Sequence, residues 1–276
     1  MALTVVITGA ASGIGRALVE AHLERGDRVF AWDCDDAGLD SLATGGVITA
    51  RVDVSCPDHV EQAADKAWKE ADGVDWVYAN AGVPASGSLL KATPEQFHAC
   101  FSVNLVGAWA TLRSFAKRMV GENRPGRLCL TGSEHSLGFQ HAGAGVYTAS
   151  KHAVLGLADV WRRELPETVS ISVLCPGLTA TAIGESPDAS DRANAMGRAM
   201  MAEGLDPKIV ARSTIEGVAR GDFLITTHSA SRIGWDARKS DVEAAFELVP
   251  EAGRDVDRYA VPAAIQRVRK RFAGSD

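Results

Sequence analysis

A tyrosine and a lysine stand four positions apart, at Tyr147 and Lys151, within a stretch that predicts a helix. Positions i and i+4 are neighbours on a helix surface. An ammonium group beside a phenol favours the phenolate, so Lys151 is expected to lower the pKa of Tyr147 from about 10 toward the working pH. A general acid and base requires such a pKa. The competing interpretation is an amphipathic helix with one surface lysine.

A glycine-rich loop follows the first apolar run, residues 3–7, with the pattern Thr8-Gly9-x-x-x-Gly13-x-Gly15. The run is β-branched without alternation, which is typical of a parallel strand covered on both faces, and a helical pattern follows the loop. Glycines at such a turn let the backbone approach a pyrophosphate, whose charge then meets the N–H groups of the helix. The spacing differs from the standard G-x-G-x-x-G of dinucleotide-binding folds, and a plain tight turn is the alternative.

Asp33 ends the next predicted strand, residues 28–32, and lies 18 residues beyond Gly15. This matches the acidic residue that hydrogen-bonds the ribose hydroxyls in dinucleotide-binding folds. A carboxylate there repels the 2′-phosphate of NADP, and no arginine or lysine stands within the next few residues. The sequence therefore predicts NAD over NADP. The alternative is that Asp33 and Asp35 only cap the following short helix.

Strand and helix patterns alternate along the chain. Further strands are predicted over residues 47–52, 74–79, 127–131, 169–174 and 223–227, and the helices between them include 57–71, 94–120 and 147–165. Such alternation implies right-handed crossovers and an α/β, Rossmann-type, doubly wound parallel sheet of about seven strands with helices on both faces. Ligands bind at the carboxyl ends of the strands in such a sheet.

The pattern predicts one domain over residues 1–230, with a helical C-terminal extension, residues 231–276, packed on it. Residues 178–205 are small, polar and methionine-containing, which favours a mobile excursion over the site or, equally, a helical hairpin on the surface. The helix that carries Tyr147 is apolar on more than one side. This second apolar face indicates a subunit partner, and hence a homodimer or homotetramer.

Composition excludes several classes of protein. The net charge of −6 and the pI near 5.7 argue against a nucleic-acid partner, and the basic run 267–271 is interpreted as a solvated helix end. No apolar run approaches the roughly 20 residues that span a bilayer, and the N-terminus has no basic signal region. The five cysteines are scattered singly, so neither a disulfide framework nor a zinc site is expected, and the chain is expected to be cytoplasmic.

Over residues 2–230 the chain resembles the short-chain dehydrogenase/reductase family. The resemblance rests on the glycine loop, Asp53, Asn80-Ala81-Gly82, Asn104, Ser133, the Tyr147 and Lys151 pair, and Pro176-Gly177. These elements occur in the order found in the family, each at the end of a predicted strand or on the expected helix. Their joint occurrence makes chance an inadequate explanation.

The resemblance implies a catalytic set. Tyr147 would exchange a proton with the substrate oxygen, and Ser133 would donate a hydrogen bond to that oxygen. Lys151 would hold the nicotinamide ribose and favour the Tyr147 phenolate. Asn104 would hold a water molecule that links Lys151 to solvent as a proton relay.

The resemblance also implies a cofactor-binding set. Asp53 and Val54 would contact the adenine, and residues 80–82 would line the adenosine side. The nicotinamide would be bordered by Pro176, Gly177, Thr179 and Thr181. The full set is Gly9, Ser12, Gly13, Ile14, Gly15, Asp33, Asp53, Val54, Asn80, Ala81, Gly82, Tyr147, Lys151, Pro176, Gly177, Thr179 and Thr181.

Two details depart from the family pattern. Ser133 precedes Tyr147 by 14 residues, one more than expected, so residues 138–145 are predicted to carry an insertion and Ser136 is an alternative catalytic serine. The tail after residue 230 is longer than the basic fold requires. His135 is interpreted as pocket wall or surface, and His135 with His141 lacks the spacing of a metal site, so no metal is expected.

The sequence thus predicts an NAD(H)-dependent oxidoreductase that interconverts a secondary alcohol and a ketone. An uncharged, fairly apolar substrate is expected from the methionine-containing excursion and from the absence of an obvious arginine clamp. One alternative is a non-catalytic NAD-binding sensor or scaffold. Another is a relative that epimerises or dehydrates a nucleotide sugar with tightly held NAD⁺, although the chain is short for the separate substrate domain of that branch.

Overall fold

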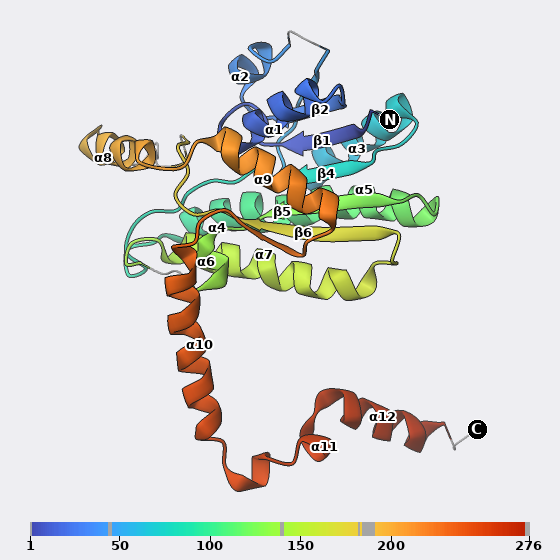
Figure 1. Cartoon of the computed structure of the whole chain (residues 1–276), viewed down its shortest axis with the longest axis vertical. Coiled ribbons are helices and arrows are strands. Elements are labelled where there is room, and N and C mark those ends of the chain that lie inside the picture. Colours follow the sequence, from blue (N-terminus) through green and yellow to red (C-terminus); the bar gives the residue numbers. More distant parts are fainter. Residues whose placement is uncertain (1, 44–45, 139–140, 182, 184–190, 274–276) are drawn as a thin grey trace. The chain divides into compact units, whose positions relative to one another are not determined.

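The computed structural model describes residues 2–43, 46–138, 141–181, 183 and 191–273. Within these residues, seven parallel strands form one sheet in the order β3-β2-β1-β4-β5-β6-β7 (Figure 1). The strands are β1 (Thr4–Thr8), β2 (Arg28–Asp33), β3 (Ile48–Arg51), β4 (Trp76–Ala79), β5 (Gly126–Thr131), β6 (Val169–Cys175) and β7 (Leu224–Thr226). The predicted doubly wound parallel sheet is confirmed.

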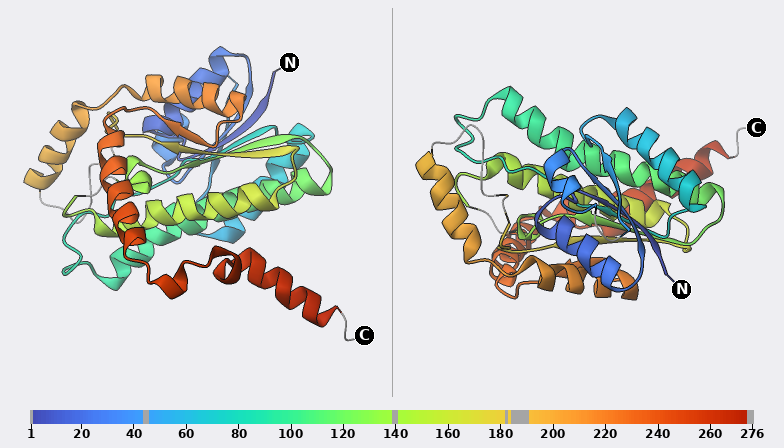
Figure 2. Two further views of the ribbon diagram at one scale, coloured as in Figure 1. Left: turned by 60° about the horizontal axis from the view of Figure 1, so that its bottom comes forward. Right: turned by 90° about the horizontal axis from the view of Figure 1, so that it is seen from above.

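Helices cover both faces of this sheet (Figure 2). Helices α1 (Gly13–Glu24) and α9 (Pro207–Arg220) pack side by side on one face. Helices α3 (Pro57–Ala71), α5 (Ala108–Gly121) and α7 (Gly145–Glu164) contribute to the core on the other face. Strand β1 shows why the run lacks alternation: Val6 packs into one core, Val5 and Ile7 pack into the other, and all three are fully buried.

The predicted helix 94–120 is not a single α-helix. Helix α4 (Pro94–Phe101) begins with a capping box in which Thr93 accepts from Gln96 N. A π-helical segment, η1 (Ser102–Gly107), then leads into α5. This correction matters for the site, because Asn104 lies within η1 and is almost completely buried. Single π-turns of this kind are frequent at functional sites.

Three further helices lie in the described part of residues 1–230. Helix α2 (Asp36–Asp40) follows β2, and α6 (Glu134–Leu137), which the sequence analysis missed, follows β5. Helix α8 (Asp191–Ala202) occupies the second half of the predicted excursion. Residues 182 and 184–190 of that excursion, and residues 139–140 of the predicted insertion, lie outside the described residues.

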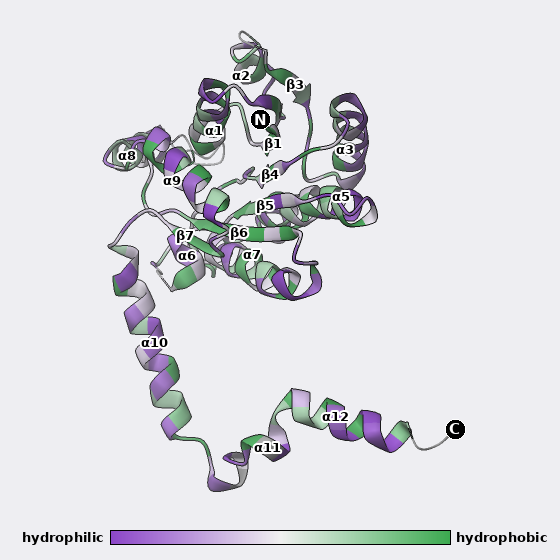
Figure 3. Ribbon diagram, turned by 45° about the vertical axis from the view of Figure 1, so that its right-hand side comes forward, coloured by the Kyte–Doolittle hydropathy of each residue, from purple (hydrophilic) through white to green (hydrophobic). Residues whose placement is uncertain are grey.

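The chain divides into two compact units, residues 1–234 and 235–276. Helix α10 (Ser231–Glu247) enters the second unit, which continues through η3 (Glu251–Gly253), α11 (Val256–Tyr259) and α12 (Val261–Phe272). The extension is helical, as predicted. Hydrophobic and hydrophilic residues mix along α10 and α12, and α12 has no buried residue (Figure 3). That the extension packs on the domain stays a prediction.

Candidate active site

The glycine loop between β1 and α1 is packed too closely for side chains. Gly9 has φ +64°, and a Cβ atom on it would lie 2.7 Å from the Ala81 Cα. A Cβ atom on Gly15 would lie only 1.9 Å from the carbonyl oxygen of Gly9. Gly13 has φ +53°, with Thr181 directly beside it. The loop therefore lies directly against Ala81 and Thr181, two residues predicted to contact the cofactor. Only glycine fits at these positions of the loop, because of the backbone conformation and the close contacts.

The start of helix α1 suits an anionic group. Ser12 is the exposed N-cap residue and makes no side-chain capping hydrogen bond, so it does not satisfy the N–H groups of the first turn. Helix N-termini of this kind attract phosphate groups through these N–H groups and the helix dipole. Ile14, in the same turn, is partly buried. The loop and helix thus fit the pyrophosphate of a dinucleotide.

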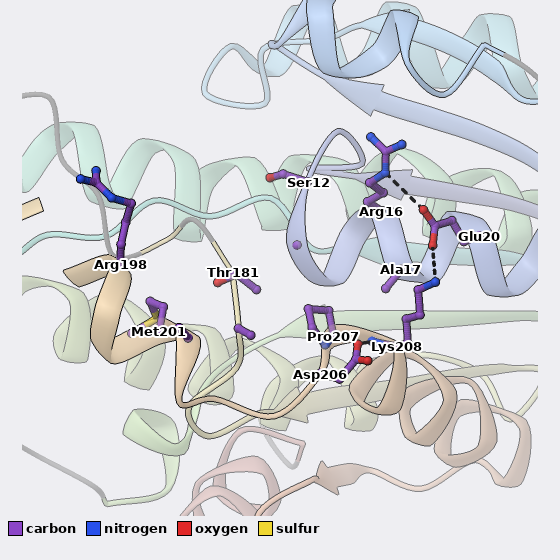
Figure 4. Close-up of a pocket in the computed structure, with 13 residues that line it drawn as sticks. Ser12, Arg16, Ala17, Glu20, Thr181, Arg198, Met201, Asp206, Pro207 and Lys208 are labelled. Carbon is purple, nitrogen blue, oxygen red and sulfur yellow. Dashed lines mark hydrogen bonds and ion pairs between the residues drawn. The ribbon is translucent and has the colours of Figure 1, made fainter. Parts of the chain in front are cut away.

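A pocket of about 540 Å³ lies beside the glycine loop. Figure 4 shows the residues that line it. Ser12 and Gly13 line it from the loop, Thr181 from the segment beyond β6, and Met201 from α8. Three charged side chains link α1 to α9 at its edge: Glu20 lies 3.2 Å from Arg16 Nε and 3.5 Å from Lys208 Nζ. Tyr147 is not among the lining residues, so this pocket belongs to the phosphate side of the site.

Asp33 lies at the carboxyl end of β2, where the sequence predicted a ribose-binding carboxylate. Its Oδ2 accepts from Ala11 N at 2.9 Å, and its Oδ1 accepts from Cys34 N at 2.8 Å. The carboxylate is thereby oriented beside the glycine loop. The capping alternative is wrong: the N-cap residue of α2 is Asp35, and its side chain makes no capping hydrogen bond. Strand pairing places Arg51 opposite Asp33, a cation that local sequence inspection missed.

Asp53 and Val54 follow β3 and have different environments. Asp53 is exposed, and its Oδ1 accepts from Ser55 N at 2.9 Å and from Ser55 Oγ at 2.7 Å. The Ser55 side-chain hydrogen bond is the largest influence that lowers the Asp53 pKa. Val54 is buried against Gly107 of η1. Asp53 can therefore face a ligand, whereas the side chain of Val54 packs in the core.

Asn80 joins the carboxyl ends of three strands. Its Nδ2 donates to Thr8 O at 3.1 Å, and its Oδ1 accepts from Thr131 Oγ1 at 3.2 Å. The hydroxyl of Thr8 also accepts from the backbone N–H of Asn80 and of Ala81. Asn80 was predicted to line the adenosine side of the site. In the structure its side chain forms hydrogen bonds that connect the ends of β1, β4 and β5 next to the glycine loop.

Ser133, Tyr147 and Lys151 come together at the carboxyl ends of β5 and β6. The Ser133 side chain is the hydrogen-bonding neighbour that acts to lower the Tyr147 pKa. The Nζ of Lys151 donates to Thr131 O at 2.7 Å and lies 5.6 Å from the centroid of the Tyr147 ring. Ser133 and Lys151 are buried, whereas Tyr147 is only partly buried. A phenol, a hydroxyl and an ammonium group are thus gathered at one place, as the sequence predicted.

The expectation that Lys151 lowers the pKa of Tyr147 is wrong for this structure. Burial raises the pKa of Tyr147 to about 12, although the hydrogen bond from Ser133 acts in the opposite direction. Burial likewise lowers the pKa of Lys151 to about 8. Both shifts have the same cause, because removal of water disfavours the charged form of each group. Tyr147 is therefore a neutral phenol here at neutral pH.

Ser136, the alternative serine, is engaged elsewhere. Its Oγ donates to Lys151 O at 2.7 Å and accepts from Ser133 N at 3.2 Å. Ser136 therefore joins α6 to the helix that carries Lys151. This geometry supports Ser133 as the serine that serves Tyr147.

Asn104 is held in η1 by hydrogen bonds on both sides of its amide. Its Oδ1 accepts from Val83 N at 2.8 Å, and its Nδ2 donates to Val83 O and to Ser150 Oγ, both at 3.0 Å. A Cβ atom on Gly82 would lie 3.3 Å from Asn104 Oδ1 and 3.5 Å from Lys151 Nζ. Gly82 thus leaves the space between the amide and the ammonium group open. A relay water between them stays a prediction.

His135 forms a wall beside Tyr147. The two rings meet edge to face with centroids 5.4 Å apart, and Nδ1 of His135 lies 2.7 Å from Thr148 Oγ1. Burial lowers the pKa of His135 to about 4, so the imidazole is neutral at neutral pH. Among the described residues, no group of three or more His, Cys, Asp or Glu side chains is arranged to hold a metal ion.

The segment beyond β6 carries the residues predicted to border the nicotinamide. Pro176 O accepts from Glu134 N at 2.8 Å, and Thr179 Oγ1 donates to Gly177 O at 3.0 Å. The sequence analysis missed His228, whose Nδ1 accepts from Gly177 N at 3.1 Å. His228 lies two residues beyond the end of β7, and the rule that ligands bind at the carboxyl ends of strands could have drawn attention to it.

Comparison with known proteins identifies the family. The model of the short chain dehydrogenase family matches residues 3–191. A 1-deoxy-11-beta-hydroxypentalenate dehydrogenase from Streptomyces avermitilis is 38% identical over 187 residues, which cover 64% of this chain and 69% of that protein. No helix of the described residues is long and apolar enough to cross a membrane.

Solved structures agree. A short-chain dehydrogenase/reductase from Burkholderia phymatum in complex with NAD superposes with a TM-score of 0.82 and 30% identity, covering 88% of this chain and 95% of that one. An alcohol dehydrogenase from Thermococcus sibiricus complexed with 5-hydroxy-NADP gives a TM-score of 0.71 at 26% identity, covering 84% and 98%. The family match, the sheet order and the site geometry lead to one conclusion: this chain is an oxidoreductase of the short-chain dehydrogenase/reductase family.

Proposed function

We propose that the protein is an NAD(H)-dependent oxidoreductase that interconverts a secondary alcohol and a ketone. The observation that carries the proposal is the grouping of a partly exposed Tyr147 with Ser133, which acts to lower the Tyr147 pKa, and with the buried Lys151 ammonium group, which lies 5.6 Å from the centroid of the phenol ring. A hydroxyl donor beside a phenol can hold the oxygen of a substrate while its proton is transferred. When bound, the nicotinamide would exchange a hydride with the carbinol carbon.

Tyr147 would exchange the proton. In ketone reduction, its neutral phenol donates a proton to the oxygen that becomes the alcohol, so the raised pKa leaves it in the required form. In alcohol oxidation, the phenolate must accept that proton. Lys151 stabilises this phenolate by its charge, and Ser133 stabilises it by donating a hydrogen bond.

We propose NAD rather than NADP because of Asp33. Its carboxylate is fixed beside the glycine loop by Ala11 N, where a 2′-phosphate would meet its negative charge. The Burkholderia relative was solved with NAD, which is consistent, whereas the Thermococcus structure contains 5-hydroxy-NADP. Arg51, opposite Asp33, lies 3.7 Å from Asp36 and is thereby drawn toward another carboxylate.

The cofactor proposal is tested by comparing NADH and NADPH affinity in wild type, Asp33→Ser and Arg51→Ala. Asp33→Ser should shift the preference toward NADPH by about tenfold or more, because it removes one repulsive charge from the 2′-phosphate. Arg51→Ala should leave the preference for NADH in place. A wild-type preference for NADPH that disappears in Arg51→Ala would instead assign the specificity to Arg51.

The proposed substrate is an uncharged, fairly apolar secondary alcohol or its ketone. Met196 and Met200 on α8 are exposed by 67% and 54%, and flexible thioethers adapt to irregular apolar ligands. The Streptomyces relative is named as a dehydrogenase of a hydroxylated compound. The substrate class is thus supported by composition and likeness.

The activity is tested with a panel of aliphatic, cyclic, aryl and steroidal secondary alcohols, by following formation of the reduced nicotinamide. We expect turnover with NAD⁺ for at least one apolar cyclic or aryl alcohol. Tight NADH binding with no turnover of any alcohol, or of the matching ketones, would favour the non-catalytic sensor or scaffold. Co-purified NAD⁺ with turnover of a nucleotide sugar would favour the epimerase or dehydratase relative.

We also propose a homodimer or homotetramer. Apolar side chains remain exposed on α5 and α7 outside the core, among them Trp109 at 36%, Val120 at 46% and Val160 at 51%. A subunit partner would remove these side chains from water. Analytical ultracentrifugation at micromolar concentration tests the proposal, and a stable monomer would contradict it.

A further inference from the structure

His228 lies in the turn between β7 and α10 and is hydrogen-bonded to the chain just beyond β6. Its Nδ1 accepts from Gly177 N at 3.1 Å, and Thr227 Oγ1 lies 2.8 Å from the same nitrogen. Its Nε2 lies 2.8 Å from Leu178 O. A carbonyl oxygen only accepts, so Nε2 carries the hydrogen and Nδ1 is the acceptor. These contacts fix the orientation of the imidazole ring.

The contact between His228 and the turn is close. A Cβ atom on Gly177 would lie 2.7 Å from the Cγ of the His228 ring, so any side chain at position 177 would displace the ring or the turn. Leu178 O also accepts from Leu205 N at 2.9 Å, which braces the turn from a second side. The turn is therefore held from two sides, by His228 beyond β7 and by Leu205 before α9.

The same turn after β7 also reaches the acid–base side of the site. Ser231 is buried, and its Oγ donates to Glu134 Oε2 at 3.1 Å. Glu134 follows Ser133, and its backbone N–H donates to Pro176 O. Residues 227–231 thus contact both loops that flank the reacting centre, one through His228 and the other through Ser231.

We propose that His228 is a positioning residue, which holds the Gly177–Leu178 turn in the conformation that receives the nicotinamide end of the cofactor. The inference rests on the proposed function, in which residues 176–181 border the nicotinamide. His228 acts through the backbone of Gly177 and Leu178, whose N–H and carbonyl groups lie within hydrogen-bond distance of its two ring nitrogens. Loss of its hydrogen bonds should loosen the nicotinamide subsite and leave the adenosine and pyrophosphate subsites intact.

The test measures dissociation constants of NADH and ADP-ribose for the full chain. ADP-ribose has the adenosine and pyrophosphate groups of the cofactor but no nicotinamide. His228→Ala should weaken NADH binding about tenfold, as expected for two hydrogen bonds lost near the ligand, and ADP-ribose binding by less than about twofold. His98→Ala, at an exposed histidine on α4, is the control and should leave both constants unchanged.

Two conservative variants separate the two contacts of the ring. His228→Asn places an amide oxygen near the position of Nδ1 and can restore the Gly177 contact, whereas His228→Gln places an amide N–H near Nε2 and can restore the Leu178 contact. Each should recover part of the NADH affinity. They also carry the test if His228→Ala does not fold, as judged by thermal unfolding.

The outcomes separate this inference from the function on which it rests. Unchanged NADH affinity in folded His228 variants would overturn the inference while the proposed function stands. Equal weakening of NADH and ADP-ribose would also overturn it, because the effect would not be confined to the nicotinamide subsite. Failure of the wild type to bind NADH would overturn the proposed function and, with it, this inference.

Discussion

Two polar clusters, each built around a tyrosine, lie toward opposite ends of the strands. Tyr147, with Ser133 and Lys151, lies where β5 and β6 end. Tyr78 on β4 contacts His22 through its hydroxyl, and His22 contacts Asp27. Asp27 lies toward the strands' beginnings, because it directly precedes β2 and accepts from Leu3 N before β1. Burial raises the pKa of both tyrosines, to about 12 for Tyr147 and well above the usual value for Tyr78.

The two clusters differ in whether their side chains are accessible to solvent. His22 Nδ1 lies 2.8 Å from Asp27 Oδ2, and its Nε2 lies 3.0 Å from the Tyr78 hydroxyl. The ring of Trp76 packs edge-on against His22, and all four side chains are buried. Tyr147, by contrast, remains partly exposed beside a glycine-lined cofactor site. A buried tyrosine with a raised pKa is thus not by itself a catalytic residue; access from the carboxyl ends of the strands makes the difference.

The largest expected effect separates the two tyrosines directly. Tyr147→Phe should lower turnover by roughly 10²–10⁴-fold with little change in stability, because it removes the proton that general acid catalysis transfers. Tyr78→Phe should leave turnover near wild type and lower the unfolding free energy by about 1–3 kcal/mol, because the buried Nε2 of His22 loses its donor. Steady-state rates and urea unfolding of both variants measure this contrast. Equal losses of turnover in the two variants would contradict the assignment of catalysis to Tyr147 alone.

The next effect removes a partner from each cluster. Ser133→Ala should reduce turnover about 10²-fold, because the substrate oxygen loses a preorganised donor. His22→Ala should keep the rate per folded molecule but destabilise the fold by about 3–5 kcal/mol, since it opens a cavity and leaves Asp27 and Tyr78 without their shared partner. Active-site titration with NADH corrects the rates for unfolded protein. If Ser133→Ala kept the wild-type rate, Ser136 would be the catalytic serine instead.

Much of this arrangement could be predicted because it depends on local pattern. β-Branched runs predicted all seven strands to within a few residues, since strands buried on both faces need apolar residues at successive positions. The catalytic candidates could be predicted because each follows a strand or lies on a predicted helix. They are Ser133, Asn104, Tyr147 and Lys151. The topology then brings them to one end of the sheet.

What could not be predicted depends on long-range contacts. The π-turn that turns Asn104 inward is stabilised by Val83 and Ser150, which are distant in sequence. His228 contacts Gly177 and Leu178, which lie 51 and 50 residues earlier in the sequence. The predicted direction of the Tyr147 pKa shift was wrong. Helical spacing indicates that a charged residue lies nearby, but it does not indicate how far burial removes water from the phenol.

Gly82→Ala tests how much space is needed between Asn104 and Lys151 in the Tyr147 cluster. The added Cβ would lie 3.3 Å from Asn104 Oδ1, and a shift of a few tenths of an ångström in that amide would disturb the space next to Lys151. Turnover should fall about tenfold, with a small effect on stability. Gly156→Ala on α7 is the matched control, because a Cβ atom there meets nothing within 4 Å. It should keep full activity and gain up to about 1 kcal/mol in stability. Equal activity of the two variants would show that Gly82 is not required for catalysis.

The smallest expected effect is a shared sensitivity to acid. Each cluster has a neutral histidine: burial lowers the pKa of His22 below its usual value and lowers that of His135, beside Tyr147, to about 4. The unfolded chain therefore binds more protons than the folded one below about pH 6.5, so stability falls as pH decreases from there toward about 4. Urea unfolding at about pH 8, 6.5 and 5 measures this decline.

The histidine variants assign the acid sensitivity to the two clusters. His22→Gln and His135→Gln should each flatten the decline, because glutamine does not titrate. Only His135→Gln should also alter activity, since only that ring packs against Tyr147. The Asp27 pKa is lowered, so its contribution to stability is lost only below about pH 4, outside this range. An unchanged decline in the double variant would mean that neither buried histidine resists protonation, and that the likeness between the two clusters ends at their tyrosines.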